Sequence, residues 1–219
     1  MKLNTFPEIV IGSSALLLMF AHGNKAMAAD TNPNIILILV DDMGYGDLNC
    51  YGGTGYLTPN INRLASQGIM FTSFYSGSSV STPSRAALLT GCYPPRVGLT
   101  DVLLPGARIG LNNTETTVPE LLKEAGYVTG IIGKWHLGDH KSMMPMEHGF
   151  DEFYGLPYSN DLWPVHYNGR LVTRDNYLKE WKLNCPPLFL FEGTEAVKEI
   201  KTLEDQDQLT TLYTGKARN

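Results

Sequence analysis

The first marked pattern along the chain is a nearly continuous apolar run, Asn34-Ile35-Ile36-Leu37-Ile38-Leu39-Val40. A run of this length and β-branched content is typical of a strand covered on both faces, as in a parallel sheet. It ends abruptly in the polar stretch Asp41-Asp42-Met43-Gly44. The pattern therefore predicts a buried strand over residues 34–40 with two carboxylates at its carboxyl end.

Three later segments share one pattern, in which a hydroxyl residue is followed by a proline in the first turn and then by helix formers. They begin at Thr58-Pro59, at Ser81-Thr82-Pro83 and at Thr117-Val118-Pro119. Thr58, Thr117 and either Ser81 or Thr82 are the predicted N-caps, because a side-chain oxygen there can bind a free backbone N–H. Apolar stretches after the first and third segments predict strands over residues 69–75 and 127–132.

Alternating strands and helices of this kind predict an α/β fold with a mainly parallel sheet flanked by helices, because parallel strands need crossover connections. The strand predicted over residues 127–132 is followed by Gly133-Lys134-Trp135-His136. After about residue 139 the pattern loosens, and from Gly169 onward it carries weak strand and helix signals and no motif.

Composition narrows the class of protein. The chain has 219 residues, 43% hydrophobic and 18% charged, with a formal net charge of −5, which is typical of a globular domain. Because it shows no basic stripe, we expect no nucleic-acid partner. The three cysteines, Cys50, Cys92 and Cys185, leave any disulfide pairing open.

The N-terminal segment resembles an export signal. Lys2 is followed by an apolar run over residues 9–21 and by Ala26-Met27-Ala28, a small-residue cleavage pattern. Residues 1–28 are therefore predicted to be a signal peptide, with residues 29–219 as the mature domain. The apolar run is short for a membrane span, so no stable membrane anchor is expected. The alternative is a buried N-terminal helix.

Polar side chains follow the predicted strands at the edge of the sheet where ligands bind in open α/β folds. Asp41 and Asp42 follow one strand, and Lys134 and His136 follow another. Ser81 begins a helix, where free N–H groups favour an anion, and Arg85 is one turn further on. Two carboxylates without a soft ligand suit calcium or magnesium. Each signal alone also fits an ordinary turn or cap, and it is their predicted convergence that indicates a site.

Two long motifs, in this order, resemble the signatures of the type I sulfatases. They are residues 79–91, SVSTPSRAALLTG, and residues 126–136, GYVTGIIGKWH. Asp41-Asp42-Met43-Gly44 resembles the family's first metal pair, and Gly149-Phe150-Asp151 and Pro157-Tyr158-Ser159 resemble the arylsulfatase A-like branch. The resemblance implies an alkaline-phosphatase-like fold and hydrolysis of a sulfate ester of a small molecule or a glycan.

The resemblance also implies a role for each matching residue. Ser81 would be oxidised to Cα-formylglycine (3-oxoalanine) by an anaerobic sulfatase-maturating enzyme, as in bacterial serine-type members exported to the periplasm or secreted. Asp41, Asp42 and the modified Ser81 would bind calcium. Arg85 and Lys134 would position the reacting group and the sulfate, His136 would accept a proton with a pKa near ~6.5, and Ser159 would contact substrate.

Two departures from the family pattern bear on this interpretation. Cys92 stands where the family usually has a basic residue. The family's further metal pair and sulfate-binding His and Lys have no match after Asp161, so the chain is predicted to be an incomplete, N-terminal part of a sulfatase. The alternatives are a phosphoester or phosphonate hydrolase of the same superfamily and a non-catalytic truncated fragment.

Overall fold

The computed structural model describes residues 32–174 and 181–218. The predicted signal peptide lies outside the described residues. The chain divides into two units, residues 1–44 and 45–219.

In the first unit, the predicted strand over residues 34–40 does not form. Residues 32–40 have no regular secondary structure, and the large side chains from Ile35 to Val40 are 45–85% exposed. Asp41 and Asp42 form a turn, with Asp42 in the left-handed region at φ 57°. A strand needs a neighbour to pair its amides. The apolar composition of residues 34–40 favours a buried strand, but a strand forms only where a neighbouring strand provides partners for its N–H and C=O groups.

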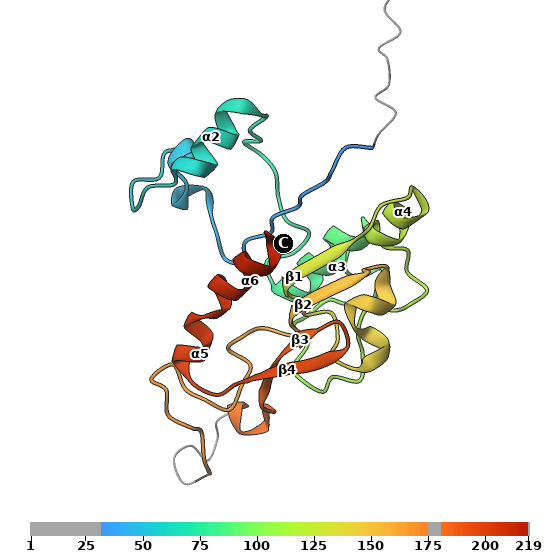
Figure 1. The fold of residues 1–219 in the computed structure, drawn as a ribbon, viewed down its shortest axis with the longest axis vertical. Helices are drawn as coiled ribbons and strands as arrows, with labels where there is room; N and C mark the ends of the chain where they lie inside the picture. The colour runs from blue at the N-terminus through green and yellow to red at the C-terminus, as the bar shows by residue number, and fades with distance from the viewer. Residues whose placement is uncertain (1–31, 175–180, 219) are drawn as a thin grey trace, which may run out of the picture. The chain divides into compact units, whose positions relative to one another are not determined.

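The second unit contains a four-stranded sheet in the order β1-β2-β3-β4 (Figure 1). Its strands are β1 (Gly130–Lys134), β2 (Glu152–Leu156), β3 (Leu188–Glu192) and β4 (Glu195–Ile200). β1 and β2 pair in parallel, whereas β2–β3 and β3–β4 are antiparallel. The α/β class is confirmed, but the described sheet is mixed rather than mainly parallel. Its antiparallel half comes from the part of the chain where the sequence showed no motif.

The helices of this unit are mostly those that the sequence predicts. They are α2 (Pro59–Gln67), α3 (Ser81–Thr90), α4 (Val118–Glu124), α5 (Leu203–Asp207) and α6 (Leu209–Ala217), with short 3₁₀ turns at Tyr45–Asp47, Asn49–Tyr51, Lys141–Met143, Pro145–His148 and Trp181–Asn184. Thr117 caps α4 as predicted, in a capping box with Glu120. None of the helices in these described ranges is long and apolar enough to cross a membrane.

Two strand predictions need correction. Residues 69–75 form no strand; tyrosine hydroxyls bind this segment instead, with Tyr45 Oη donating to the Phe74 carbonyl at 3.0 Å and Tyr51 Oη to the Phe71 carbonyl at 3.0 Å. The predicted strand over residues 127–132 begins later, at Gly130. The reason is that the Tyr127 N–H still binds the Leu122 carbonyl in the turn that ends α4.

A polar anchor fixes the start of the parallel pair β1–β2. Asp151 Oδ2 accepts hydrogen bonds from the Thr129 N–H at 2.9 Å and the Thr129 hydroxyl at 3.0 Å, while Asp151 Oδ1 pairs with Lys123 Nζ at 2.7 Å. These contacts, led by that of Lys123, lower the pKa of Asp151 to about 2. The anchor sets the register of β1 and therefore where the residues at its carboxyl end lie.

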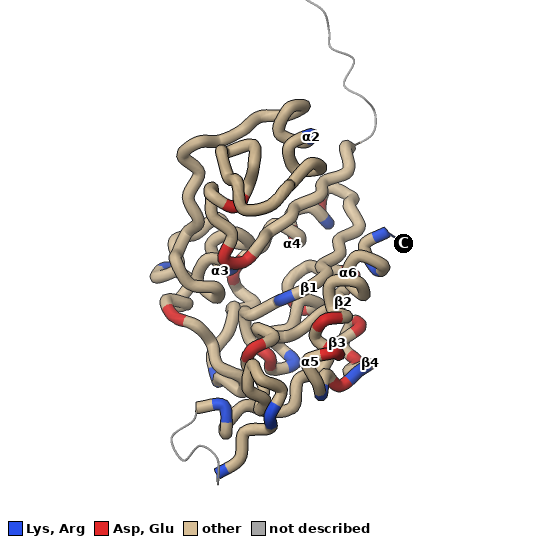
Figure 2. Tube along the Cα trace, turned by 90° about the vertical axis from the view of Figure 1, so that its left-hand side faces the viewer, with Lys and Arg blue, Asp and Glu red and all other residues tan. Residues whose placement is uncertain are grey.

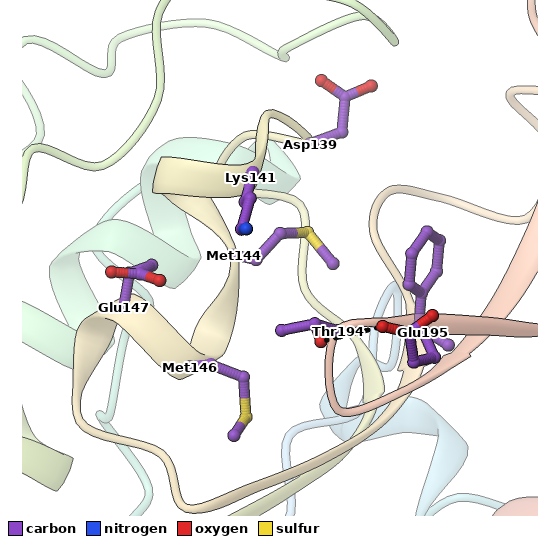
Figure 3. Close-up of a pocket in the computed structure, with 8 residues that line it drawn as sticks. Asp139, Lys141, Met144, Met146, Glu147, Thr194 and Glu195 are labelled. Atoms are coloured by element: carbon purple, nitrogen blue, oxygen red, sulfur yellow. Dashed lines mark hydrogen bonds between the residues drawn. The ribbon is translucent and has the colours of Figure 1, made fainter.

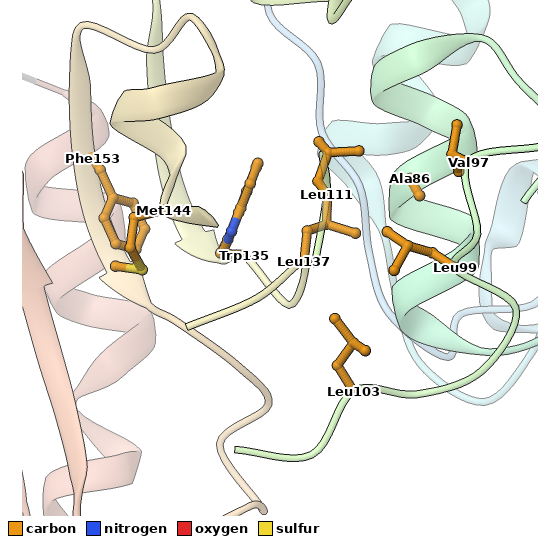
Figure 4. Close-up of a cluster of buried hydrophobic side chains, with 9 residues drawn as sticks. All are labelled: Ala86, Val97, Leu99, Leu103, Leu111, Trp135, Leu137, Met144 and Phe153. Atoms are coloured by element: carbon orange, nitrogen blue, oxygen red, sulfur yellow. The ribbon is translucent and has the colours of Figure 1, made fainter. Parts of the chain in front are cut away.

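Two apolar clusters pack on the sheet. The first joins α3 and the loops after it to β1 and β2 (Figure 4); its buried members are Ala86, Val97, Leu99, Leu103, Leu111, Trp135, Leu137, Met144 and Phe153. The second lies where α6 covers the sheet. There Tyr154 of β2 packs edge-on against Tyr213 of α6, with the ring centroids 6.3 Å apart. Phe153 and Tyr154 are adjacent, so β2 supplies both clusters from its two faces.

Charged residues of both signs are interspersed along the second unit (Figure 2). Around β3, β4 and the two C-terminal helices they form ion pairs: Lys216–Glu192 at 2.6 Å, Lys198–Asp205 at 3.0 Å and Lys201–Glu199 at 3.0 Å. These pairs lie at the surface, where each contributes little to stability.

Lowering the pH from about 7 to about 5 is expected to destabilise the chain, in part through His148. Its ring is buried, and the ring centroids of His148 and Trp135 lie 5.7 Å apart. Within the described ranges, neither ring nitrogen has a hydrogen-bond partner. Burial lowers the pKa of His148. The unfolded state therefore binds the proton first, and stability is lost as pH falls below ~6.5, by up to about 1.4 kcal/mol per pH unit for one such group.

The measurement is urea unfolding at both pH values. We expect His148→Phe to lose less stability between them than the parent, and comparison within each variant removes the pH-independent cost of the substitution. His140→Phe, at an exposed ring, is the matched control. An equal pH dependence in His148→Phe and the parent would contradict the prediction.

Candidate active site

Ser81 is the first residue of α3, and its hydroxyl is available for chemistry because it does not cap the helix. The N-cap is Val80, in an extended conformation, with no side-chain capping bond. The predicted caps Ser81 and Thr82 are therefore wrong by one or two positions. α3 ends at Gly91, whose φ of 65° is favourable for glycine.

Arg85 links Ser81 to the end of β1. Its Nε donates a hydrogen bond to Ser81 Oγ at 3.1 Å, and its Nη1 donates to the Lys134 carbonyl at 2.7 Å. The four-residue spacing puts Ser81 and Arg85 on one face of α3. The guanidinium therefore lies at the helix N-terminus, where the helix dipole also favours an anion.

His136 approaches Ser81 from the other side. Its Nδ1 lies 3.3 Å from Ser81 Oγ, and its Nε2 lies 2.9 Å from the Leu103 carbonyl oxygen. Because a carbonyl only accepts, Nε2 carries the hydrogen and Nδ1 is left as an acceptor. Ser81 Oγ can then accept from Arg85 and donate to His136 at the same time.

The environment of His136 keeps its ring neutral. The side chain is 2% exposed, and burial lowers its pKa to about 4, with the charges of Lys134 and Arg85 acting in the same direction. The hydrogen bond to Leu103 opposes this shift in part. The expectation of a pKa near ~6.5 is therefore wrong. At neutral pH the ring is therefore unprotonated, and Nδ1 can accept a hydrogen bond.

The backbone around His136 is held in an unusual conformation. His136 has φ 62°, in the left-handed region that non-glycine residues rarely adopt. Beside it, a Cβ at Gly155 would overlap the carbonyl of Gly133, so β1 and β2 approach closely only because residue 155 is glycine. The Trp135 and His136 N–H groups continue this ladder to the Leu156 and Pro157 carbonyls at 2.9 and 3.0 Å.

Lys134 and Ser159 follow strands of the same parallel pair. Lys134 is the last residue of β1 and is half-buried, and its charge acts on His136. Ser159 comes three residues after the end of β2 and is also half-buried. The structure thus brings Ser81, Arg85, Lys134 and His136 together, and the substrate contact of Ser159 stays a prediction.

Asp41 and Asp42 belong to the first unit, so their calcium role stays a prediction. Both are exposed in their turn. Within residues 32–174 and 181–218, no group of three or more His, Cys, Asp or Glu side chains is close enough to hold a metal ion. Cys50, Cys92 and Cys185, whose pairing the sequence left open, are all free thiols.

A pocket of about 270 Å³ lies between the β3–β4 hairpin and the two 3₁₀ turns at Lys141–Met143 and Pro145–His148 (Figure 3). It is lined by Asp139, Lys141, Met144, Met146, Glu147, Phe191, Thr194 and Glu195. None of the predicted site residues lines it. Asp139 is already bound, since its Oδ2 accepts from the Gly106 N–H at 2.7 Å.

Sequence reasoning missed two residues that shape the site. Thr82 was considered only as a cap, but its hydroxyl binds the His136 carbonyl at 2.9 Å. Leu103 holds the His136 ring through its carbonyl. A backbone carbonyl is present at every position, so no sequence signal could have identified Leu103.

The comparisons identify the class of protein. The sulfatase family profile matches residues 33–210, and the chain belongs to that family. It is 50% identical to human arylsulfatase A over 153 residues, covering 68% of this chain and 30% of that protein. Across eight of the curated relatives that it matches, the chain spans 26–40% of their length.

Solved structures agree with this assignment. The PsFucS1 sulfatase from Pseudoalteromonas sp. superposes with a TM-score of 0.75 at 34% identity, covering 94% of this chain and 42% of that one. BT4656, solved in complex with its substrate D-glucosamine-2-N,6-O-disulfate, gives a TM-score of 0.58 at 28% identity, covering 86% of this chain and 32% of that one.

Proposed function

We propose that this chain forms part of a sulfate ester hydrolase whose reacting group is made from Ser81. The observation that carries the proposal is the position of Ser81 Oγ, 3.1 Å from Arg85 Nε and 3.3 Å from the unprotonated Nδ1 of His136. An anion-binding helix end, a guanidinium and a neutral base meet at one hydroxyl.

Arg85 and Lys134 supply the positive charge that a sulfate group needs. The Arg85 guanidinium is held in place by the Lys134 carbonyl, so it needs little reordering when an anion arrives. Lys134, the last residue of β1 and two residues before His136, would add a second cation. Both residues would offset charge on the sulfate as the ester bond breaks.

The surroundings of Ser81 also suit its conversion to formylglycine. Two different polar groups, a donor on Arg85 and an acceptor on His136, already face its side chain. A hydrated formylglycine would supply two hydroxyls on one carbon: one would attack sulfur as the alcohol of the ester leaves, and the other, on losing its proton, would expel sulfate and restore the aldehyde. Arg85 would orient the first of these, and His136 Nδ1 would take the proton of the second.

Calcium is proposed as the cofactor on the chemistry of the donors. Asp41 and Asp42 offer hard carboxylate oxygens, which calcium prefers, and with the modified Ser81 they would hold the ion. A bound calcium would offset negative charge at the reacting oxygen. Because calcium takes about 6–8 oxygens, these residues account for only part of its coordination.

The substrate class is proposed as an aryl or sugar sulfate. A relative is named arylsulfatase A, and BT4656 was solved with a sulfated glucosamine. We further propose an anaerobic sulfatase-maturating enzyme as the partner that converts Ser81, and export to the periplasm or the medium through the signal at residues 1–28.

The conversion of Ser81 is testable by mass. In a host that carries an anaerobic maturating enzyme, the peptide containing Ser81 is expected to be lighter than encoded by one pair of hydrogens, and to react with a hydrazide probe. The whole enzyme of which this chain is proposed to form part should release nitrophenol from nitrophenyl sulfate much faster than from nitrophenyl phosphate. An unshifted peptide in an active preparation would exclude formylglycine, and a preference for the phosphate ester would exclude the sulfatase assignment.

A further inference from the structure

Thr82, which follows the proposed reacting residue, lies fully inside the protein. Its side chain is 0% exposed. Its hydroxyl donates to the His136 carbonyl at 2.9 Å and accepts from the Leu103 N–H at 3.2 Å. Both hydrogen bonds cross long stretches of sequence, so Thr82 joins α3 to the end of β1 and to the loop at Leu103.

Together with a third hydrogen bond, these two form a closed circuit of contacts among Thr82, Leu103 and His136. The Leu103 carbonyl accepts the Nε2–H of His136 at 2.9 Å. Leu103 is therefore held by Thr82 through its N–H and holds His136 through its carbonyl. His136 in turn is bound twice, at its backbone carbonyl by Thr82 and at its ring by Leu103.

The conformation of His136 explains why such a circuit is needed. A left-handed φ of 62° is unfavourable for a residue with a Cβ, so it persists only where the surroundings hold it. The Thr82 hydroxyl holds the carbonyl of that same residue. If the Thr82 hydroxyl is removed, its bonds to the His136 carbonyl and from the Leu103 N–H are both lost, so the backbone turn at His136 and the Leu103 carbonyl that receives Nε2–H are free to shift.

We infer that Thr82 is a positioning residue: its buried hydroxyl fixes Leu103 and the His136 backbone so that the imidazole keeps its hydrogen on Nε2 and turns Nδ1 toward Ser81. The effect of Thr82 on turnover rests on the proposed function, whereas its effect on the tautomer of His136 does not. The competing explanation is that Thr82 only fills space beside Ala86 and Leu103, in which case its shape would matter and its hydroxyl would not.

The experiment compares Thr82→Val, which keeps the shape and removes the hydroxyl, with Thr82→Ser, which keeps the hydroxyl and removes a methyl group. The readout is the ¹⁵N NMR spectrum of the His136 ring at neutral pH, without substrate, assigned by its loss in His136→Gln. The parent and Thr82→Ser are expected to show Nε2 protonated and Nδ1 unprotonated. Thr82→Val is expected to show a mixture of the two tautomers.

Thr90→Val is the matched control on the same helix, because the Thr90 hydroxyl also binds a backbone carbonyl, that of Ala86 at 2.7 Å, away from His136. It should leave the parent tautomer intact. A single Nε2–H tautomer in Thr82→Val, or a mixture in Thr82→Ser, would overturn the inference. If Thr82→Val does not fold, Thr82→Ala takes its place against Thr82→Ser with the same expected difference.

Turnover of nitrophenyl sulfate separates this inference from the proposed function. Because general-base catalysis contributes about 10²–10⁴-fold, we expect Thr82→Val to lower kcat by roughly 10- to 100-fold with KM changed by less than about twofold. A disturbed tautomer with unchanged kcat would support the positioning role and count against His136 as the proton acceptor. An undisturbed tautomer would overturn the positioning role whatever the activity.

Discussion

Replacing Ser81 with alanine is expected to reduce sulfate ester hydrolysis to background, a loss of at least about 10³-fold, because the reacting group of a covalent mechanism cannot be replaced by its neighbours. The fold should persist. The substitution removes one half-buried hydroxyl with two hydrogen bonds, a cost of about 1 kcal/mol. Turnover of nitrophenyl sulfate and thermal unfolding, measured on the same preparation, check both parts.

Ser66→Ala is the control for this prediction. Ser66 is exposed at the end of α2, where its hydroxyl donates to the Arg63 carbonyl at 2.8 Å. It removes the same atom from a helix outside the site and should leave turnover unchanged. Retention of a tenth or so of the parent rate in Ser81→Ala would show that the chemistry does not depend on residue 81, and the proposed function would fail.

Replacing Trp135 with alanine is expected to cost about 3–5 kcal/mol in the free energy of unfolding, which is a large share of the ~5–15 kcal/mol available to a typical domain. Trp135 is 1% exposed at the centre of the first apolar cluster (Figure 4). Its Nε1 donates to the Met143 carbonyl at 2.8 Å, and its ring meets Phe150 edge-on at 6.2 Å. Urea unfolding at constant pH measures the loss.

Trp181→Ala is the matched control because the same side chain is 45% exposed there. Its ring lies under Lys182 Nζ at 5.1 Å, a contact whose loss costs about 0.5–1 kcal/mol at an exposed site. Similar losses for the two tryptophans would mean that the apolar cluster around Trp135 does not dominate stability. Because Trp135 precedes His136, its loss should also disorder the proton acceptor.

Local sequence signals predicted the parts of the fold that depend on local interactions. The proline and hydroxyl pattern predicted the helices that became α2, α3 and α4, since capping and proline geometry act within one turn. Strands were predicted less well. Residues 34–40 and 69–75 have strand-like composition but pair with no strand in the described part of the chain, whereas β3 and β4 were not recognised. Strand pairing is non-local, so composition alone does not decide it.

The candidate site also has features that the sequence predicted and features that depend on non-local contacts. Residue type and the predicted ends of strands and helices indicated that the side chains of Ser81, Arg85, Lys134 and His136 lie near one another. In the structure, Arg85 binds Ser81 and the Lys134 carbonyl, and His136 lies beside Ser81. Their roles in catalysis stay a prediction. The sequence also determined membership of the sulfatase family, which the match over residues 33–210 shows.

Only the tertiary structure decided which atoms meet and in which protonation state. It placed Val80 rather than Ser81 at the cap, which left the Ser81 hydroxyl for Arg85 and His136. It buried His136 and lowered its pKa to about 4. It also assigned Thr82 and the Leu103 carbonyl to His136. The physical reason is that hydrogen-bond partners and desolvation depend on residues brought together from distant parts of the chain, and a linear motif records residue types without their surroundings.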